Sequence, residues 1–150
     1  MSIFRPHRAF AVIAMSFMGI LSAGVKAPDS LFLPISLDNA LVLAAKQNRI
    51  VFIDFCSPWC GACKRLDEDT WTNGKVIEGL KRNTIPLKLD ADKAPIIRDK
   101  YKVNAYPTLL FLNPDGSVRA RVVGYQIPTR FIETLQGVLA AKSDPVREPK

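Results

Sequence analysis

The three cysteines of the chain, Cys56, Cys60 and Cys63, lie within eight residues and directly follow a run of apolar side chains. This run, RIVFIDF at residues 49–55, is typical of a central strand covered on both faces. The sequence CGACKRLDEDTW that begins at Cys60 contains no proline and many good helix formers, which predicts a helix. We therefore expect the cysteines at the point where a buried strand passes into a helix.

The rest of the chain alternates between helical and strand patterns. We expect helices at residues 36–48, 74–83, 95–103 and 128–142, with Ser36 as the N-cap of the first, and a strand at 84–92. Residues 107–125 predict two strands joined by a turn at 113–116, where proline and glycine favour a hairpin. This order predicts a single α/β domain with a central mixed β-sheet flanked by helices.

The N-terminal 27 residues predict an export signal. Arg5, His7 and Arg8 precede an uncharged apolar run at residues 9–24, which is short for a membrane span and ends in small residues. We expect a secretory signal peptide at 1–27 or, if it is not cleaved, an anchor that tethers the protein to the inner membrane through residues 9–24. The linker is then 28–35, the domain 36–142 and the polar C-terminal tail 143–150. The domain is expected to be exported, to a periplasmic or other extracytoplasmic location.

Length and charge restrict the class of partner. A chain of 150 residues, 48% hydrophobic, suits one domain with a real core. Removal of residues 1–27 deletes three basic residues and no acidic ones, which lowers the formal net charge from +7 to +4. Because the remaining lysines and arginines are scattered along the sequence, we expect no nucleic-acid partner.

The spacing of the cysteines predicts chemistry rather than a structural crosslink. An odd number leaves one thiol outside any internal disulfide, and a C-x-x-C closes too short a loop to stabilise the fold much. Cys60 and Cys63 would share one face of the first helical turn, where backbone N–H groups and the helix dipole favour a thiolate. We expect Cys60 to attack a substrate disulfide and Cys63 to resolve the mixed disulfide.

Two segments, FIDFCSPWCGACK and then AYPTLLFLNPDG, resemble the thioredoxin family, and the resemblance covers nearly all of the chain after about residue 35. The stretch WCGACKRLDEDTW is also similar to the C-terminal periplasmic domains of DsbD-type disulfide reductases. The resemblance implies a thioredoxin-like fold and a thiol:disulfide oxidoreductase that uses no cofactor and no metal. Its expected partners are disulfide-containing proteins and an unidentified electron-donor redox protein.

The resemblance also implies roles for individual residues. Asp54 matches the buried acid beneath the resolving cysteine, which moves its proton, and Lys88 matches the lysine that pairs with this acid. Pro107 matches the cis-proline that faces the active disulfide. The expected substrate-binding residues are Trp59, Ala105, Tyr106 and Pro107.

Other functions are compatible with the cysteine cluster. Cys56 and Cys60 form a C-x-x-x-C, as in exported copper chaperones with a thioredoxin fold, although the one histidine, His7, lies in the predicted signal. The three cysteines together match the C-x-x-x-C-x-x-C of radical S-adenosylmethionine enzymes, which require a larger barrel. A binding module with an inert dithiol is a third alternative.

The direction of the redox reaction is a separate question. Gly61-Ala62 differs by one residue from the Gly-Pro of thioredoxins and is unlike the Pro-His of the strong periplasmic oxidant. Together with Asp54 it favours a reductase, with a disulfide oxidase or isomerase as the alternative. Cys56 stands where thioredoxins carry a large aromatic residue, and it is either a small apolar filler or a third thiol that exchanges with Cys60 or protects it from over-oxidation.

Overall fold

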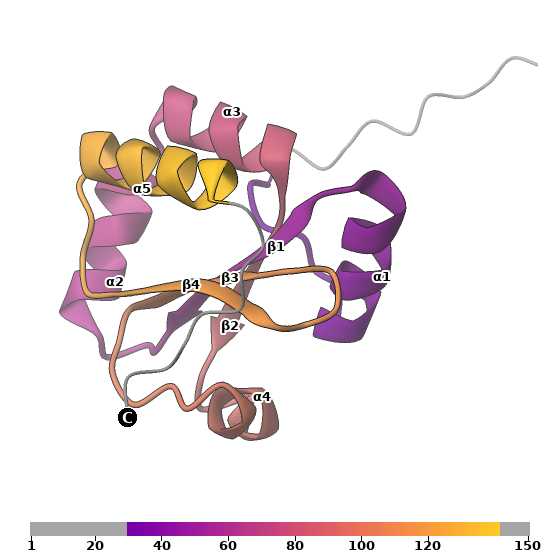
Figure 1. The fold of residues 1–150 in the computed structure, drawn as a ribbon. Coiled ribbons are helices and arrows are strands. Elements are labelled where there is room, and N and C mark those ends of the chain that lie inside the picture. Colours follow the sequence, from indigo (N-terminus) through magenta and orange to yellow (C-terminus); the bar gives the residue numbers. More distant parts are fainter. Residues whose placement is uncertain (1–29, 142–150) are drawn as a thin grey trace, which may run out of the picture.

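Four strands form one sheet in the order β2-β1-β3-β4 (Figure 1). The computed structural model describes residues 30–141, so the predicted signal or anchor and the polar tail lie outside the described residues. The strands are β1 Ile50–Cys56, β2 Thr84–Asp90, β3 Thr108–Leu112 and β4 Val118–Val123. β1 runs parallel to β2 and antiparallel to β3, and β3 runs antiparallel to β4. The predicted mixed sheet and its hairpin are confirmed.

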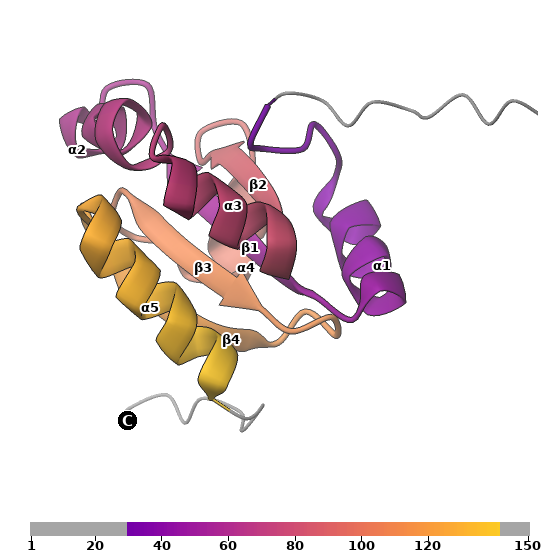
Figure 2. The same cartoon turned by 90° about the horizontal axis from the view of Figure 1, so that it is seen from above.

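Helices cover both faces of this sheet (Figure 2). They are α1 Leu37–Gln47, α2 Gly61–Arg65, η1 Leu66–Thr70, α3 Gly74–Asn83, α4 Pro95–Lys100 and α5 Pro128–Ala140. Side chains of α1 and α4 pack on one face, and side chains of η1, α3 and α5 pack on the other. Within residues 30–141, no helix has both the length and the apolar character needed to span a membrane.

Alternation along β1 decides which side chains meet which helices. Val51, Ile53 and Phe55 point towards the α1 face, whereas Ile50 and Phe52 point towards α3 and α5. Because side chains of a strand alternate between its faces, Asp54 falls on the same face as Phe52. The strand therefore directs a carboxyl group into the layer that contains η1.

The predicted helix after Cys60 is present but not uniform. α2 has five residues and continues into η1, a π-helical turn in which the Trp71 N–H donates to the Leu66 carbonyl at 2.8 Å. A π-turn adds one residue to the helical repeat and rotates the following side chains around the axis. This rotation determines which residues after α2 face the sheet.

Candidate active site

The end of β1 places the cysteines where the sequence predicts them. After β1 ends at Cys56, a short turn brings Cys60 to the N-cap of α2, and Cys60 forms a disulfide with Cys63 with a Cα–Cα distance of 5.3 Å. The Cys63 backbone N–H donates to Cys60 Sγ at 3.2 Å. Cys60 is 8% exposed and Cys63 is 2% exposed, so Cys60 is the more accessible of the two residues.

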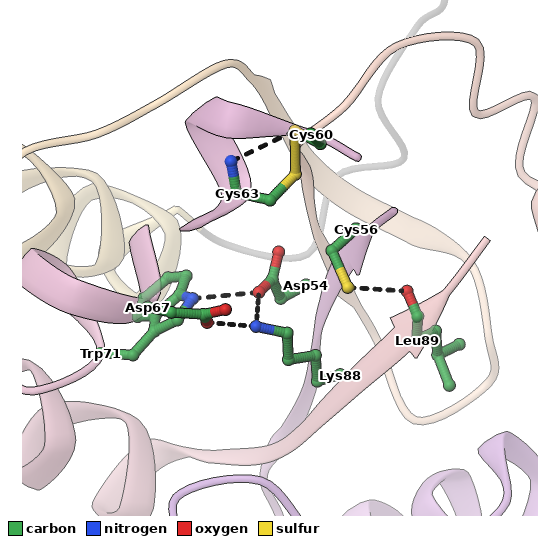
Figure 3. A network of polar contacts seen from close by, with 8 residues as sticks. All are labelled: Asp54, Cys56, Cys60, Cys63, Asp67, Trp71, Lys88 and Leu89. Carbon is green, nitrogen blue, oxygen red and sulfur yellow. Dashed lines mark hydrogen bonds and ion pairs between the residues drawn. A yellow bond between two sulfur atoms is a disulfide. The ribbon is translucent and has the colours of Figure 1, made fainter. Parts of the chain in front are cut away.

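Asp54 lies beneath this disulfide, fully buried (Figure 3). Its Oδ2 accepts a hydrogen bond of 3.0 Å from Trp71 Nε1, whereas its Oδ1 has no hydrogen-bond partner within the described residues. Burial raises the pKa of Asp54 from 3.8 to about 6, because removal from water disfavours the charged form. A carboxyl group with this pKa exchanges its proton near neutral pH.

Lys88 contacts the same carboxyl from the neighbouring strand. Lys88 is the register partner of Asp54 in the parallel pair, and its Nζ lies 3.6 Å from Asp54 Oδ2. The same ammonium group also donates to Asp67 of η1. Lys88 therefore bridges a buried carboxyl and a half-exposed one, as Figure 3 shows.

Sequence reasoning did not identify Asp67 and Trp71 as parts of this site. Asp67 lies in η1 and accepts from Lys88, and Trp71, the residue directly after η1, donates to Asp54. A regular α-helix from Cys60 onward would have placed the Trp71 side chain differently. The available signal was Asp54 itself, since a buried carboxyl in an apolar strand requires nearby donors.

Cys56 stands apart from the other two cysteines. Its Sγ donates to the Leu89 carbonyl oxygen at 3.6 Å, and Figure 3 shows its side chain directed away from the disulfide. Burial raises the pKa of the Cys56 thiol to about 11, and the nearby Asp54 adds to the shift. Since Cys60 pairs with Cys63, copper binding through the C-x-x-x-C of Cys56 and Cys60 is not favoured. Among residues 30–141, no cluster of three or more His, Cys, Asp or Glu side chains is arranged to hold a metal ion.

Of the predicted substrate-binding residues, Trp59 directly precedes Cys60 in the chain and contacts Tyr106. Trp59 is 69% exposed, and its ring meets the Tyr106 ring edge to face with centroids 5.9 Å apart. The Tyr106–Pro107 peptide bond is cis. Ala105 is exposed, and its carbonyl oxygen accepts from Thr108 Oγ1 at 2.7 Å. The backbone N–H and carbonyl of Tyr106 make no hydrogen bond within the described part of the chain.

Two cavities differ in their relation to the disulfide. One of about 230 Å³ adjoins it and is lined by Cys56, Ser57, Pro58, Cys63, Lys64, Asp67 and Asp90. A larger one, of about 930 Å³, is lined by residues at the start of β1, the β3–β4 turn and the end of α5. Two arginines in its wall, Arg49 and Arg119, donate to backbone carbonyls that end α3 and α5. These arginines are thus used to hold helix ends in place.

Comparison with known proteins agrees with the geometry. A family model described as a thioredoxin-like domain matches residues 37–139, which include both disulfide-bonded cysteines, Asp54, Lys88 and Pro107. The chain belongs to the thioredoxin-like family. The thioredoxin-like fold implied by the sequence motifs is confirmed.

Two relatives and one solved structure show the range of this family. The chain is 31% identical over 103 residues to protein disulfide isomerase-like 5-3 of Oryza sativa subsp. japonica, covering 69% of this chain and 24% of that protein. It is 34% identical over 106 residues to the thiol:disulfide interchange protein DsbD of Yersinia pestis (strain Pestoides F), covering 66% and 18%. A putative disulphide-isomerase from Bacteroides thetaiotaomicron, known from its solution structure, aligns with a TM-score of 0.65 and 32% identity over 75% of this chain and 94% of that one.

The length of the relatives limits what they imply. This thioredoxin-like chain spans about a quarter or less of the rice and Yersinia proteins that it matches. Their similarity therefore concerns the domain that carries the C-x-x-C pair, and not the remaining parts of those proteins.

Proposed function

We propose that this chain is an exported thiol:disulfide oxidoreductase that reduces disulfides in proteins through Cys60 and Cys63. The observation that carries the proposal is the disulfide between an N-capping cysteine and the next turn of the helix, directly above a buried carboxyl. The relatives named as disulfide isomerases and as a thiol:disulfide interchange protein support the same class of reaction.

The reaction begins with the reduced dithiol. The Cys60 thiolate attacks one sulfur of a substrate disulfide, forms a Cys60–substrate disulfide and releases the other substrate sulfur as a thiolate. The Cys63 thiolate then attacks Cys60 Sγ, closes the Cys60–Cys63 disulfide and releases the second substrate thiolate. The substrate gains two electrons and the dithiol loses two. A partner dithiol of a donor redox protein must supply two electrons before the next cycle.

Asp54 provides the base for the second step. Cys63 has to lose its proton before it attacks, and the unbonded Oδ1 of Asp54 lies on the side of the carboxyl that faces the disulfide (Figure 3). Because its pKa is about 6, the carboxyl is mostly ionised at neutral pH, yet it binds a proton more strongly than an exposed aspartate does. Lys88, which also contacts Asp67, holds the ionised form in place.

Trp59, Ala105, Tyr106 and Pro107 form the surface that receives the substrate. The exposed indole of Trp59 and the ring of Tyr106 offer apolar contact area next to Cys60. The unused backbone N–H and carbonyl of Tyr106 are suited to pair with an extended peptide, as an added strand does. The carbonyl of Ala105 already accepts a hydrogen bond from Thr108, so Ala105 contributes its exposed methyl group.

Reduction is the direction that we propose, and net oxidation or isomerisation is the alternative. The Gly-Ala between the cysteines and the buried Asp54 favour reduction, whereas relatives named as isomerases keep the alternative open. An exported, periplasmic location is supported by the predicted signal at residues 1–27 and by similarity to DsbD. If the signal is not cleaved, residues 9–24 would tether the domain to the membrane.

Reduction of insulin by dithiothreitol in the presence of the protein tests the proposal. We expect the wild-type protein to accelerate precipitation of the insulin B chain and the Cys60→Ser variant to give the uncatalysed rate. Cys56→Ala serves as the matched control, because it removes a thiol from the same segment without touching the disulfide. Equal rates for wild type and Cys60→Ser would contradict the proposed activity.

A further inference from the structure

Residues 31–33, here called the strap, pack beside the active site although they precede the region that matches the thioredoxin-like family model. The Leu33 N–H donates to the Pro86 carbonyl of β2 at 2.9 Å, which fixes the strap along this strand. Leu31 and Phe32 pack against the apolar cluster of η1, α3 and α5. The strap falls within the segment that the sequence predicts as a linker, residues 28–35.

Phe32 contacts both groups that contact the buried carboxyl of Asp54. The Lys88 ammonium nitrogen lies 5.7 Å from the centre of the Phe32 ring. The Phe32 and Trp71 rings meet edge to face, with centroids 5.8 Å apart and an angle of 87°. Lys88 Nζ and Trp71 Nε1 both contact Asp54 Oδ2. The Phe32 ring therefore packs against both groups that contact this one carboxylate oxygen.

The Phe32 ring is an apolar neighbour of a partly exposed charge. The Lys88 side chain is 26% exposed, and the negative face of the ring attracts its ammonium group. Loss of the ring would remove the apolar neighbour of the Lys88 ammonium and of the Trp71 indole, and so let water come closer to both. Asp54 would then be less strongly desolvated.

We propose that Phe32 is a positioning residue that keeps Lys88 and Trp71 on Asp54 and excludes water from the three. This inference rests on the proposed function, in which Asp54 accepts the proton of Cys63. It adds to the active site a residue from outside the region that defines the family.

The charged and titratable groups around Asp54 are Lys88 of β2, Asp67 of η1 and Cys56 of β1. Cys63 of α2 also lies over Asp54, but it is disulfide-bonded and does not titrate in the oxidised protein. Burial is the largest cause of the raised pKa of Asp54, ahead of the opposing attraction of Lys88. Removal of the Phe32 ring would let water closer, which lowers the pKa of Asp54, and would loosen Lys88 and Trp71, which raises it; we expect the first effect to be the larger, since burial is the largest cause of the raised pKa.

Titration of the Asp54 side-chain carboxyl by ¹³C NMR in the oxidised full-chain protein tests the inference. We expect its midpoint near pH 6 in the wild type. In Phe32→Ala the midpoint should fall towards the ordinary aspartate value of about 3.9. Phe32→Leu keeps most of the apolar bulk, so its Asp54 midpoint should lie closer to the wild-type value than to that of Phe32→Ala. If Phe32→Ala does not fold, Phe32→Val should show a smaller fall in the same direction.

Leu139→Ala is the matched control. Leu139 is partly buried against the same apolar cluster and lines the larger cavity rather than the smaller one at the disulfide, so the substitution lowers stability without touching Lys88 or Trp71. We expect it to leave the Asp54 midpoint unchanged. An unchanged midpoint in Phe32→Ala or Phe32→Val, with stability lowered as in the control, would show that Phe32 only packs. The titration uses no substrate, so this failure is distinct from absence of insulin reduction.

Discussion

The indole Nε1 of Trp71 donates a hydrogen bond of 3.0 Å to Oδ2 of Asp54 in the interior, and this leaves Oδ1 of the same carboxyl without a partner among the described residues. Most buried polar atoms in proteins are hydrogen-bonded, so an unbonded buried carboxylate oxygen is costly and points to a functional role. Here it lies on the side of the disulfide (Figure 3). One oxygen is thus held in place while the other is available for a proton.

The first prediction concerns stability against pH. The folded state raises the pKa of Asp54 from 3.8 to about 6, so it binds the Asp54 proton more tightly than the unfolded state does. Stability from this group is therefore fully present below about pH 4 and is lost as the pH rises through about 6. A neutral Asp54→Asn side chain avoids this loss and still accepts the Trp71 hydrogen bond.

We expect the oxidised Asp54→Asn variant to be more stable than the wild type at pH 8, by up to about 3 kcal/mol for a pKa difference of about two units. The gain should shrink below pH 6 and disappear near pH 4. Urea unfolding between pH 4 and 8 measures it, with the exposed Asp92→Asn as control. A gain that does not vary with pH would contradict a raised pKa in the folded state.

The second prediction concerns Asp67, which shares the Lys88 ammonium with Asp54. The negative charge of Asp67 raises the pKa of Asp54, although less than burial does. In Asp67→Asn this repulsion disappears and Lys88 is free to approach Asp54, so the pKa of Asp54 should fall. Cys63 resolves the mixed disulfide between Cys60 and the substrate, and the pH at which this step reaches half of its maximal rate should fall together with the pKa of Asp54. Glu68→Gln, on the same turn, removes an equal charge and should leave the profile unchanged.

The third prediction separates the roles of the two cysteines. Cys63→Ser should accumulate a mixed disulfide between Cys60 and the substrate, because attack no longer leads to resolution. Cys60→Ser should form no such complex, since Cys63 is the more buried residue. Non-reducing electrophoresis followed by peptide mass mapping identifies the trapped sulfur. Trapping through Cys63 instead of Cys60 would reverse the assignment.

Much of the fold is predictable from the sequence because local signals agree with the tertiary structure. The apolar run before Cys56 forms β1, and the proline and glycine at 113–116 form the turn between β3 and β4. Ser36 caps α1 through a hydrogen bond from the Asn39 N–H. In each case the residues that determine the conformation are neighbours in sequence.

The rest of the site depends on contacts between distant segments. Trp71 reaches Asp54 from the end of η1, where the helix contains an extra residue, and propensities do not predict a π-turn. Phe32 lies in a short stretch without helical or strand periodicity, so no pattern distinguishes it from a linker. Its role depends on the position of β2, which lies more than fifty residues away in sequence.

The fourth prediction concerns the reduction potential of Cys60–Cys63. We expect a value nearer to that of thioredoxin, about −270 mV, than to that of the strong periplasmic oxidant, about −120 mV. The difference of about 150 mV corresponds to roughly 7 kcal/mol for two electrons, so the two classes are well separated. Equilibration with glutathione or dithiothreitol redox buffers measures it. A potential above about −160 mV would favour an oxidase or isomerase.

The last prediction concerns Cys56. Its thiol donates to Leu89 on the neighbouring strand, and burial raises its pKa to about 11, so it is protonated at neutral pH. A protonated thiol is a poor nucleophile and a poor metal ligand, which favours the role of a small apolar filler beside the cavity of about 230 Å³. We expect Cys56→Ala to leave the potential and the insulin reduction rate nearly unchanged. Peptide mapping of the oxidised wild type should find Cys60–Cys63 as the main disulfide, with Cys56 as a free thiol. A Cys56–Cys60 bond as the main species would instead make the C-x-x-x-C the working motif, and copper binding would become the next measurement.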